Sequence, residues 1–187
     1  MIAPRSRSSS ATAGGDASTP EWKEKLRDGT TVLIRPISAA DIGIEREFIE
    51  RLSPQSRRYR FLGEIAAPGS VLLDRLTHPD PAHEAAFIAL VADGAHKREI
   101  GVARFSADKD DRSCECAVAV ADEWQGKGLA TLLMRHLIEI ARQRGYRRMY
   151  SIDARDNEGM RELAEFLGFE RRADPNDATQ VVHSLSL

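Results

Sequence analysis

Residues 124–131 read Trp124-Gln125-Gly126-Lys127-Gly128-Leu129-Ala130-Thr131. The stretch follows an apolar, strand-like segment, Cys116 to Val120, and precedes an amphipathic segment that predicts a helix over Leu129 to Arg144. The first turn of a helix leaves backbone N–H groups unpaired and carries the positive end of the helix dipole, so it attracts anions. Glycines have no Cβ and let an anion approach the backbone closely. The stretch therefore predicts a phosphate-binding loop between a strand and a helix.

The spacing within this loop distinguishes three phosphate-binding patterns. A Walker A loop needs four residues between its first glycine and Gly-Lys-Ser/Thr, which the stretch lacks. A dinucleotide fingerprint needs glycine or alanine at its sixth position, where Thr131 stands. The third pattern, Gln/Arg-x-x-Gly-x-Gly/Ala, is met by Gln125, Gly128 and Ala130. A tight strand–helix turn whose glycines serve packing alone is the alternative to a binding loop.

The composition indicates a soluble globular domain. The chain has 187 residues, of which 42% are hydrophobic and 30% charged, and its formal net charge is −2. Without an overall basic field we expect no nucleic-acid partner, and no apolar run predicts a membrane span. Residues 1–20 are rich in Ser, Ala, Gly and Thr, which predicts a disordered tail before a domain over residues 21–187. This tail lacks the apolar centre of a secretory signal, so we expect a cytoplasmic protein.

The sequence does not predict a disulfide or a metal site. Cys114 and Cys116 stand two apart on one predicted strand, where a disulfide has the wrong geometry, so we expect two reduced thiols. No further Cys or His pair follows at ligand spacing, and His78 and His83 lie in a proline-rich loop. We therefore expect no metal.

Hydrophobic periodicity predicts a mixed α/β domain without repeats or an internal boundary from residue 31 onward. Strands are expected at Thr31–Arg35, Ala85–Val91, Glu99–Ser106, Arg112–Val120 and Arg148–Asp153, followed by a closing hairpin of Phe169–Arg172 and Thr179–Leu187. Helices are expected from the N-cap Ser38 to about Leu52 and at Gln55–Leu62, Pro68–Leu76, Leu129–Arg144 and Glu158–Leu167.

The loop resembles the coenzyme A pyrophosphate loop of the GNAT acetyltransferase superfamily. Two flanking segments share the likeness: the strand end Val118-Ala119-Val120, and Asn157 followed by a helix and Gly168-Phe169. The resemblance implies a single-domain GNAT fold, with a mixed and mostly antiparallel twisted sheet flanked by helices, and acetyl-CoA as cosubstrate. In that superfamily the strand before the loop splays from its neighbour and pairs with pantetheine. The implied cosubstrate contacts are Val118, Val120, Gln125, Gly126, Lys127, Gly128, Leu129, Ala130, Thr131 and Asn157.

The segment Ser53 to Phe61 resembles the Ser-x-x-Ser-x-x-x-Arg-Phe segment of bacterial protein lysine acetyltransferases, whose GNAT domain this chain most resembles. The likeness implies a protein lysine as acceptor. A small amine is the second acceptor, and a solvated basic helix with Tyr59 and Phe61 packed inward is the other interpretation of the segment. A sensor that binds acyl-CoA without turnover, or a Rossmann-like nucleotide binder, would replace the enzyme altogether. A monomer and a homodimer both fit the sequence.

Acetyl transfer to an amine needs a base, because a lysine amine with a pKa near 10.4 arrives protonated. Glu115 is the best candidate, because it lies in a small, apolar strand that disfavours a carboxylate unless it is paired or functional. The lysine acetyltransferases that Ser53–Phe61 resembles carry a glutamate base at the matching position. An ion pair with Arg104 is the alternative, and Asp122 and Glu123 are weaker candidates for the base.

The rest of the expected chemistry is direct attack of the amine in a ternary complex. The backbone N–H of Val118 is the candidate to polarise the thioester oxygen. Many GNAT enzymes place a tyrosine four residues before the Gly-Phe pair as general acid, but here Ala164 stands at that position. Solvent or another group, with Tyr150 conceivable, would then protonate the departing thiolate.

Overall fold

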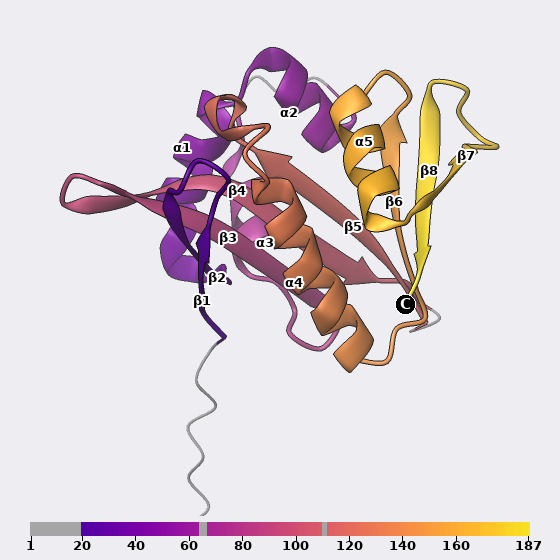
Figure 1. The fold of residues 1–187 in the computed structure, drawn as a ribbon, viewed down its shortest axis with the longest axis horizontal. Helices are drawn as coiled ribbons and strands as arrows, with labels where there is room; N and C mark the ends of the chain where they lie inside the picture. The colour runs from indigo at the N-terminus through magenta and orange to yellow at the C-terminus, as the bar shows by residue number, and fades with distance from the viewer. Residues whose placement is uncertain (1–19, 64–66, 110–111) are drawn as a thin grey trace, which may run out of the picture.

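The computed structural model describes residues 20–63, 67–109 and 112–187, and in these ranges eight strands form one sheet. The strands are β1 (Trp22–Lys25), β2 (Thr31–Pro36), β3 (Glu84–Asp93), β4 (His96–Ala107), β5 (Ser113–Val120), β6 (Arg148–Ala154), β7 (Glu170–Ala173) and β8 (Gln180–Ser186). Their order across the sheet is β1-β2-β3-β4-β5-β6-β8-β7, and every neighbouring pair is antiparallel except β5 and β6 (Figure 1). The predicted mixed and mostly antiparallel sheet is confirmed.

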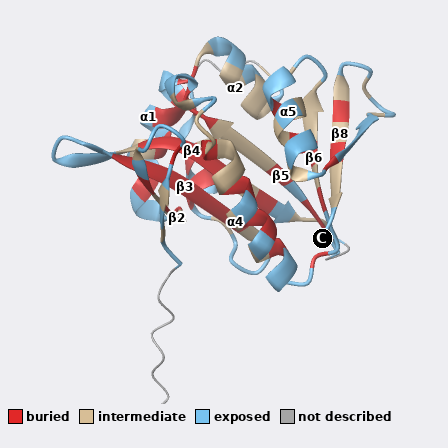
Figure 2. Cartoon of the chain, in the orientation of Figure 1, coloured by how far each residue is buried: buried red, intermediate tan, exposed pale blue. Residues whose placement is uncertain are grey.

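Helices cover both faces of this sheet. The α-helices of the described residues are α1 (Ile42–Arg51), α2 (Pro54–Phe61), α3 (Ser70–Thr77), α4 (Leu129–Gln143) and α5 (Glu158–Leu167). Helix α4 packs across β3, β4 and β5 over one apolar core, and much of α4 and of these strands is buried (Figure 2). Helices α1 and α3 bury a second core on the other face. No helix in the described ranges is both long and apolar enough to cross a membrane.

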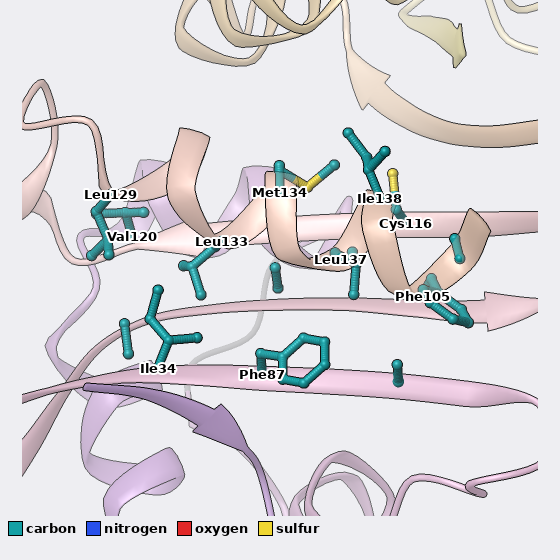
Figure 3. Packing of buried hydrophobic residues seen from close by; sticks show 14 of the residues in the cluster. Ile34, Phe87, Phe105, Cys116, Val120, Leu129, Leu133, Met134, Leu137 and Ile138 are labelled. Carbon is teal, nitrogen blue, oxygen red and sulfur yellow. The ribbon is translucent and has the colours of Figure 1, made fainter. Parts of the chain in front are cut away.

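Helix α4 holds the first core together through its predicted apolar stripe. Leu129, Leu133 and Leu137 are at most 1% exposed and point toward Ile34, Phe87 and Phe105 of the sheet (Figure 3). Leu132 and Ile140 are only partly buried and lie at the margin. Each fully buried leucine of this kind stabilises the fold by about 1.5–3 kcal/mol. The stripe therefore fixes the N-terminus of α4, and the loop before it, against the sheet.

Strands β5 and β6 are paired over a short stretch and then diverge. They pair only at three positions, from Ser113 with Arg148 to Glu115 with Tyr150. Beyond Glu115 the two strands diverge, while β6 stays paired with β8 up to Ala154 (Figure 1). Residues 116–120 of β5 consequently have one backbone edge without a strand partner. The splayed strand that the resemblance implies is present.

Strand β1 is absent from the sequence prediction. Its four residues, Trp-Lys-Glu-Lys, are mostly charged and give no apolar alternation, but they pair with β2 and place Trp22 against α4. The other predicted strands and helices are present with small shifts at their ends. Residues 1–19 of the predicted tail lie outside the described residues, as do residues 64–66 and 110–111.

Candidate active site

A cavity of about 980 Å³ opens where β5 and β6 diverge. Ligand-binding pockets in proteins commonly have volumes of this order. Its wall includes residues 115–120 of β5, the glycine loop, the first turn of α4, the end of β6, and parts of α2 and α5. The cavity therefore brings together the two segments, residues 53–61 and 124–131, that the sequence singled out separately.

The two glycines of the loop adopt backbone conformations that other residues rarely take. Gly126 has a φ of +72° and Gly128 a φ of +88°, both in the left-handed region that favours glycine. A Cβ at Gly126 would meet no atom within 4 Å, so its surface is open to the cavity. Gly128 is the N-cap of α4 and makes no side-chain cap, which leaves the N–H groups of the first turn for an anion.

Most of the predicted loop residues line the cavity: Gln125, Gly126, Gly128, Leu129, Ala130 and Thr131. Lys127 is not among the lining residues. Its ammonium lies 3.1 Å from the Asp28 carboxylate and 4.4 Å from the centroid of the Trp124 ring. Gln125 lines the cavity but turns its side-chain amide back, to donate to the Val120 carbonyl at 3.2 Å. An anion would thus meet the backbone of this loop before its side chains.

The open edge of β5 presents the backbone of Val118. Residues i and i+2 of a strand direct their N–H and C=O groups to the same side. The Val120 carbonyl accepts from Gln125, whereas the next N–H, that of Ala121, donates to Ile100 of β4. Val118 therefore directs its backbone groups away from β4 and toward the split, where an amide-rich chain can pair with them. The Val120 carbonyl already accepts one hydrogen bond, from Gln125, and has less capacity left for a ligand.

Glu115 stands at the point where the two strands separate. It lines the cavity, and in the described residues it makes no hydrogen bond and no ion pair. The alternative partner, Arg104, lies instead 3.9 Å from Glu84. Partial burial, and then the nearby charges of Asp108 and Asp153, raise the pKa of Glu115 above its ordinary value. A carboxylate without a partner and with a raised pKa is a suitable proton acceptor.

The weaker candidates for the base have other contacts. Asp122 accepts hydrogen bonds from the Ser53 N–H at 2.9 Å and from the Ser53 and Ser56 hydroxyls, both at 2.8 Å. Although burial opposes them, these bonds keep the pKa of Asp122 below its usual value. Glu123 lies 3.3 Å from Arg98 and does not line the cavity. Asp122 thus connects α2 to the loop, and Glu123 belongs to the surface.

The expected position of the tyrosine acid holds Ala164, which has no proton to donate, and the hydroxyl of Tyr150 is engaged elsewhere. Ala164 is 1% exposed and packs in the core under α5, outside the cavity lining. Tyr150 donates its hydroxyl hydrogen to Asp108 at 2.9 Å, and it does not line the cavity either. Burial and this bond raise the pKa of the Tyr150 phenol.

Helix α2 forms a wall of the cavity and is tied across it. Its N-cap, Ser53, is anchored by Asp122, while at the other end Arg58 lies 2.7 Å from Asp156 in the turn after β6. Tyr59 also donates to the Asp156 carbonyl at 3.1 Å. Nearby, Asn157 lines the cavity and caps α5 by accepting from the Met160 N–H at 3.1 Å. Asn157 therefore caps α5 at a position where it also faces the cavity.

Arg27 also lines the cavity, although it was not among the residues predicted for the site. It belongs to the turn between β1 and β2, about a hundred residues before the loop. Nothing in its local sequence connects it with the glycines, and only the tertiary fold brings the two together. For metals, the described residues contain no group of three or more His, Cys, Asp or Glu arranged to hold an ion.

Comparison with known proteins gives consistent results. Residues 54–169 match the sequence profile of the Acetyltransferase (GNAT) family. The chain is 49% identical over 166 residues to acetyltransferase PA5475 of Pseudomonas aeruginosa, a match that covers 89% of each chain. It is 30% identical over 146 residues to acetyltransferase Pat of Mycolicibacterium smegmatis, but covers only 43% of that longer protein.

A solved structure gives the same assignment. The GNAT domain of S. lividans PAT superposes with a TM-score of 0.81 at 27% sequence identity, covering 89% of this chain and 97% of that domain. The profile match, the homologues and the shared fold agree with the splayed sheet and the glycine loop. This chain belongs to the GNAT acetyltransferase family and is an acetyl-CoA-dependent acyltransferase.

Proposed function

We propose that this protein transfers the acetyl group of acetyl-CoA to the side-chain amine of a protein lysine, with Glu115 as the general base. The observation that carries the proposal is the position of Glu115. Its carboxylate, which has no partner among the described residues, lines the cavity at the last paired residue of β5, next to the open strand edge. An amine held there would reach both a proton acceptor and a thioester aligned along that edge.

The residues present fit acetyl-CoA. The left-handed glycines and the uncapped first turn of α4 suit its diphosphate, and the free edge at Val118 suits the amides of its pantetheine arm. The remaining predicted contacts, from Val120 and Gln125 to Thr131 and Asn157, belong to the same proposal, except that Lys127 would contribute its backbone and not its side chain. When bound, acetyl-CoA supplies an activated thioester.

The chain's own residues supply proton transfer and polarisation. Glu115 accepts a proton from the acceptor ammonium, which releases the neutral amine as nucleophile in a ternary complex. The Val118 N–H donates to the thioester oxygen as negative charge develops on it. The Tyr59 phenol lines the cavity, but its hydroxyl donates to the Asp156 carbonyl, so we assign protonation of the thiolate to solvent.

Two features favour a cationic amine on a protein. The cavity is lined by six acidic side chains: Glu115, Asp122, Asp153, Asp156, Glu158 and Glu162. Such a lining attracts an ammonium group. The Ser53–Phe61 segment, which resembles the protein lysine acetyltransferases, forms part of the cavity wall. We propose action in the cytoplasm, by a monomer or a homodimer.

Thiol release from acetyl-CoA, measured with lysine peptides, polyamines and amino acids, tests the proposal. Wild-type protein should turn over fastest with lysine peptides. Glu115→Gln should lower kcat/KM by about 10²- to 10⁴-fold while calorimetry shows unchanged CoA binding. Glu123→Gln, which removes a carboxylate outside the cavity, is the matched control and should keep full activity.

Other outcomes have distinct meanings. Tight CoA binding without turnover of any amine would identify a sensor, and turnover restricted to free polyamines or amino acids would identify a small-molecule enzyme. Full activity of Glu115→Gln would remove the assigned base. Affinity for NAD without affinity for CoA would contradict the whole proposal.

A further inference from the structure

The one basic side chain of the glycine loop, that of Lys127, does not point into the cavity. Lys127, the basic residue between the two glycines, is neutralised by Asp28 at 3.1 Å and rests over the Trp124 ring. Hydrogen bonds from Thr30, and then from Lys127, lower the pKa of Asp28 to about 2, so this carboxylate is charged at neutral pH. Lys127 is therefore engaged away from the cavity.

The side chain of Arg27 lies beside the glycine loop, at the start of α4. The backbone N–H of Arg27 donates to the Lys127 carbonyl at 3.1 Å, which docks the β1–β2 turn on the loop. Its side chain then extends over Gly128: a Cβ built on that glycine would be 3.5 Å from Nε and 3.6 Å from Cγ of Arg27. In the described residues the guanidinium makes no ion pair and no side-chain hydrogen bond, and it lines the cavity.

The charges of the cavity make this arginine important for an anionic ligand. Among the described residues, the lining has six acidic side chains and two cationic ones, Arg27 and Arg60. Arg60 lies at the α2 end, where its Nη2 atom is buried and its charge faces Glu45 and Glu99. Arg27 is thus the cation that stands beside the N-terminus of α4.

We propose that Arg27, and not Lys127, is the side chain that binds the diphosphate of acetyl-CoA, so the β1–β2 turn completes the binding site. This inference rests on the proposed use of acetyl-CoA at the loop. A guanidinium can donate two parallel hydrogen bonds to a phosphate, while the N–H groups of α4 approach from the other side. Contact with Gly128, at the start of the helix, assigns Arg27 to the diphosphate rather than to the 3′-phosphate.

Calorimetric titration with CoA, dephospho-CoA and acetyl-pantetheine tests this assignment on the full chain. Arg27→Ala should weaken binding of CoA and of dephospho-CoA about tenfold or more, because it removes charge-assisted bonds. Acetyl-pantetheine has no diphosphate, so its binding should not change. Arg27→Lys should recover part of the affinity. Lys25→Ala removes an exposed cation from the same hairpin and should bind all three like wild type.

Each contrary result has its own meaning. Equal binding of CoA by wild type and Arg27→Ala would overturn the proposal while leaving the use of acetyl-CoA intact. A larger loss in Lys127→Ala than in Arg27→Ala would return the role to the loop lysine. A loss confined to CoA would move Arg27 to the 3′-phosphate, and an equal loss with acetyl-pantetheine would show a structural effect. If wild type bound no CoA at all, the proposed function itself would fail.

Discussion

Glu115 combines two properties that rarely occur together at one carboxylate: it reaches the cavity, and it has no cationic partner among the described residues. The split of the sheet explains both. Glu115 is the last residue of β5 that pairs with β6, so it lies where the cavity opens between the two strands. The neighbouring acids Asp108 and Asp153 then act on it mainly through charge.

The pH dependence of the reaction should report this environment. Only the ionised form of Glu115 accepts a proton, so kcat/KM should fall as pH decreases through its raised pKa. Asp108→Asn removes one of the negative charges that raise this pKa, and should move the acid limb of the pH profile to lower pH. Glu50→Gln changes an exposed acid elsewhere and should leave the limb in place. A limb that Asp108→Asn did not move would mean that another group titrates.

At this scale the sequence identified candidates but could not show what they touch. Glu115 was recognisable as a carboxylate in an apolar strand, and its alternative, an ion pair with Arg104, is not formed. Lys127 was expected in the loop from its position alone; its partner Asp28 and the competing Arg27 come from a distant hairpin. No local pattern records such a long-range contact.

The β1–β2 hairpin matters beyond its size because it connects the sheet edge to α4. Trp22 stacks on His136 of α4, with ring centroids 4.2 Å apart, and meets the edge of Phe87 at 5.2 Å. His136 also lies 2.9 Å from Glu24. His136 thus joins the hairpin to α4 through both a ring contact and a polar contact. The strand itself was missed because its pairing with β2, rather than apolar alternation, makes it a strand.

Loss of this contact should destabilise the protein and weaken its cosubstrate site together. Trp22→Ala removes a large, half-buried ring, and should lower the free energy of unfolding by about 2 kcal/mol in chemical denaturation. Because the hairpin carries Arg27, CoA binding should also weaken. Lys23→Ala, an exposed neighbour in the same strand, should change neither quantity by a measurable amount. An unchanged stability for Trp22→Ala would show that β1 contributes little to the fold.

For the molecule as a whole, the sheet sets the position of the glycine loop by letting α4 approach closely. Gly101 of β4 makes this possible: a Cβ there would be 3.1 Å from Leu129, 3.2 Å from Leu133 and 3.2 Å from the Ala119 carbonyl. Leu129 is the first residue of α4 and follows Gly128 directly. The closeness of helix and sheet at this point therefore determines where the loop lies.

A methyl group at this contact should disturb both stability and binding. Gly101→Ala places a methyl group into the close contact between β4 and the first turns of α4. It should lower the free energy of unfolding by about 1–3 kcal/mol and weaken CoA binding. Gly43→Ala is the matched control, because a Cβ in that helical position meets nothing within 4 Å and alanine favours helices. If both variants unfolded at the same denaturant concentration as wild type, the close approach would have no energetic role.

Much of the whole-molecule architecture could be predicted, because it depends on periodic patterns. The stripe of α4 and the apolar runs of β3 and β5 are regular enough to define the elements, and the loop resemblance supplied their arrangement. The pairing of β1, the bond from Gln125 to Val120 and the anchoring of α2 by Asp122 are not periodic. They depend on which distant segments the finished fold places side by side.

The divergence of β5 from β6 creates an unusual hazard: a strand edge in the middle of a sheet, where most proteins have none. Exposed edges invite pairing with other chains and hence aggregation. Here α2 and α5 flank the gap, and the Arg58–Asp156 bridge ties α2 to the turn that follows β6. The gap is therefore too restricted for a β-strand of another molecule to pair with β5, whereas a narrow ligand that carries amide groups can bind there. The same arrangement thus permits ligand binding and disfavours aggregation through the open edge.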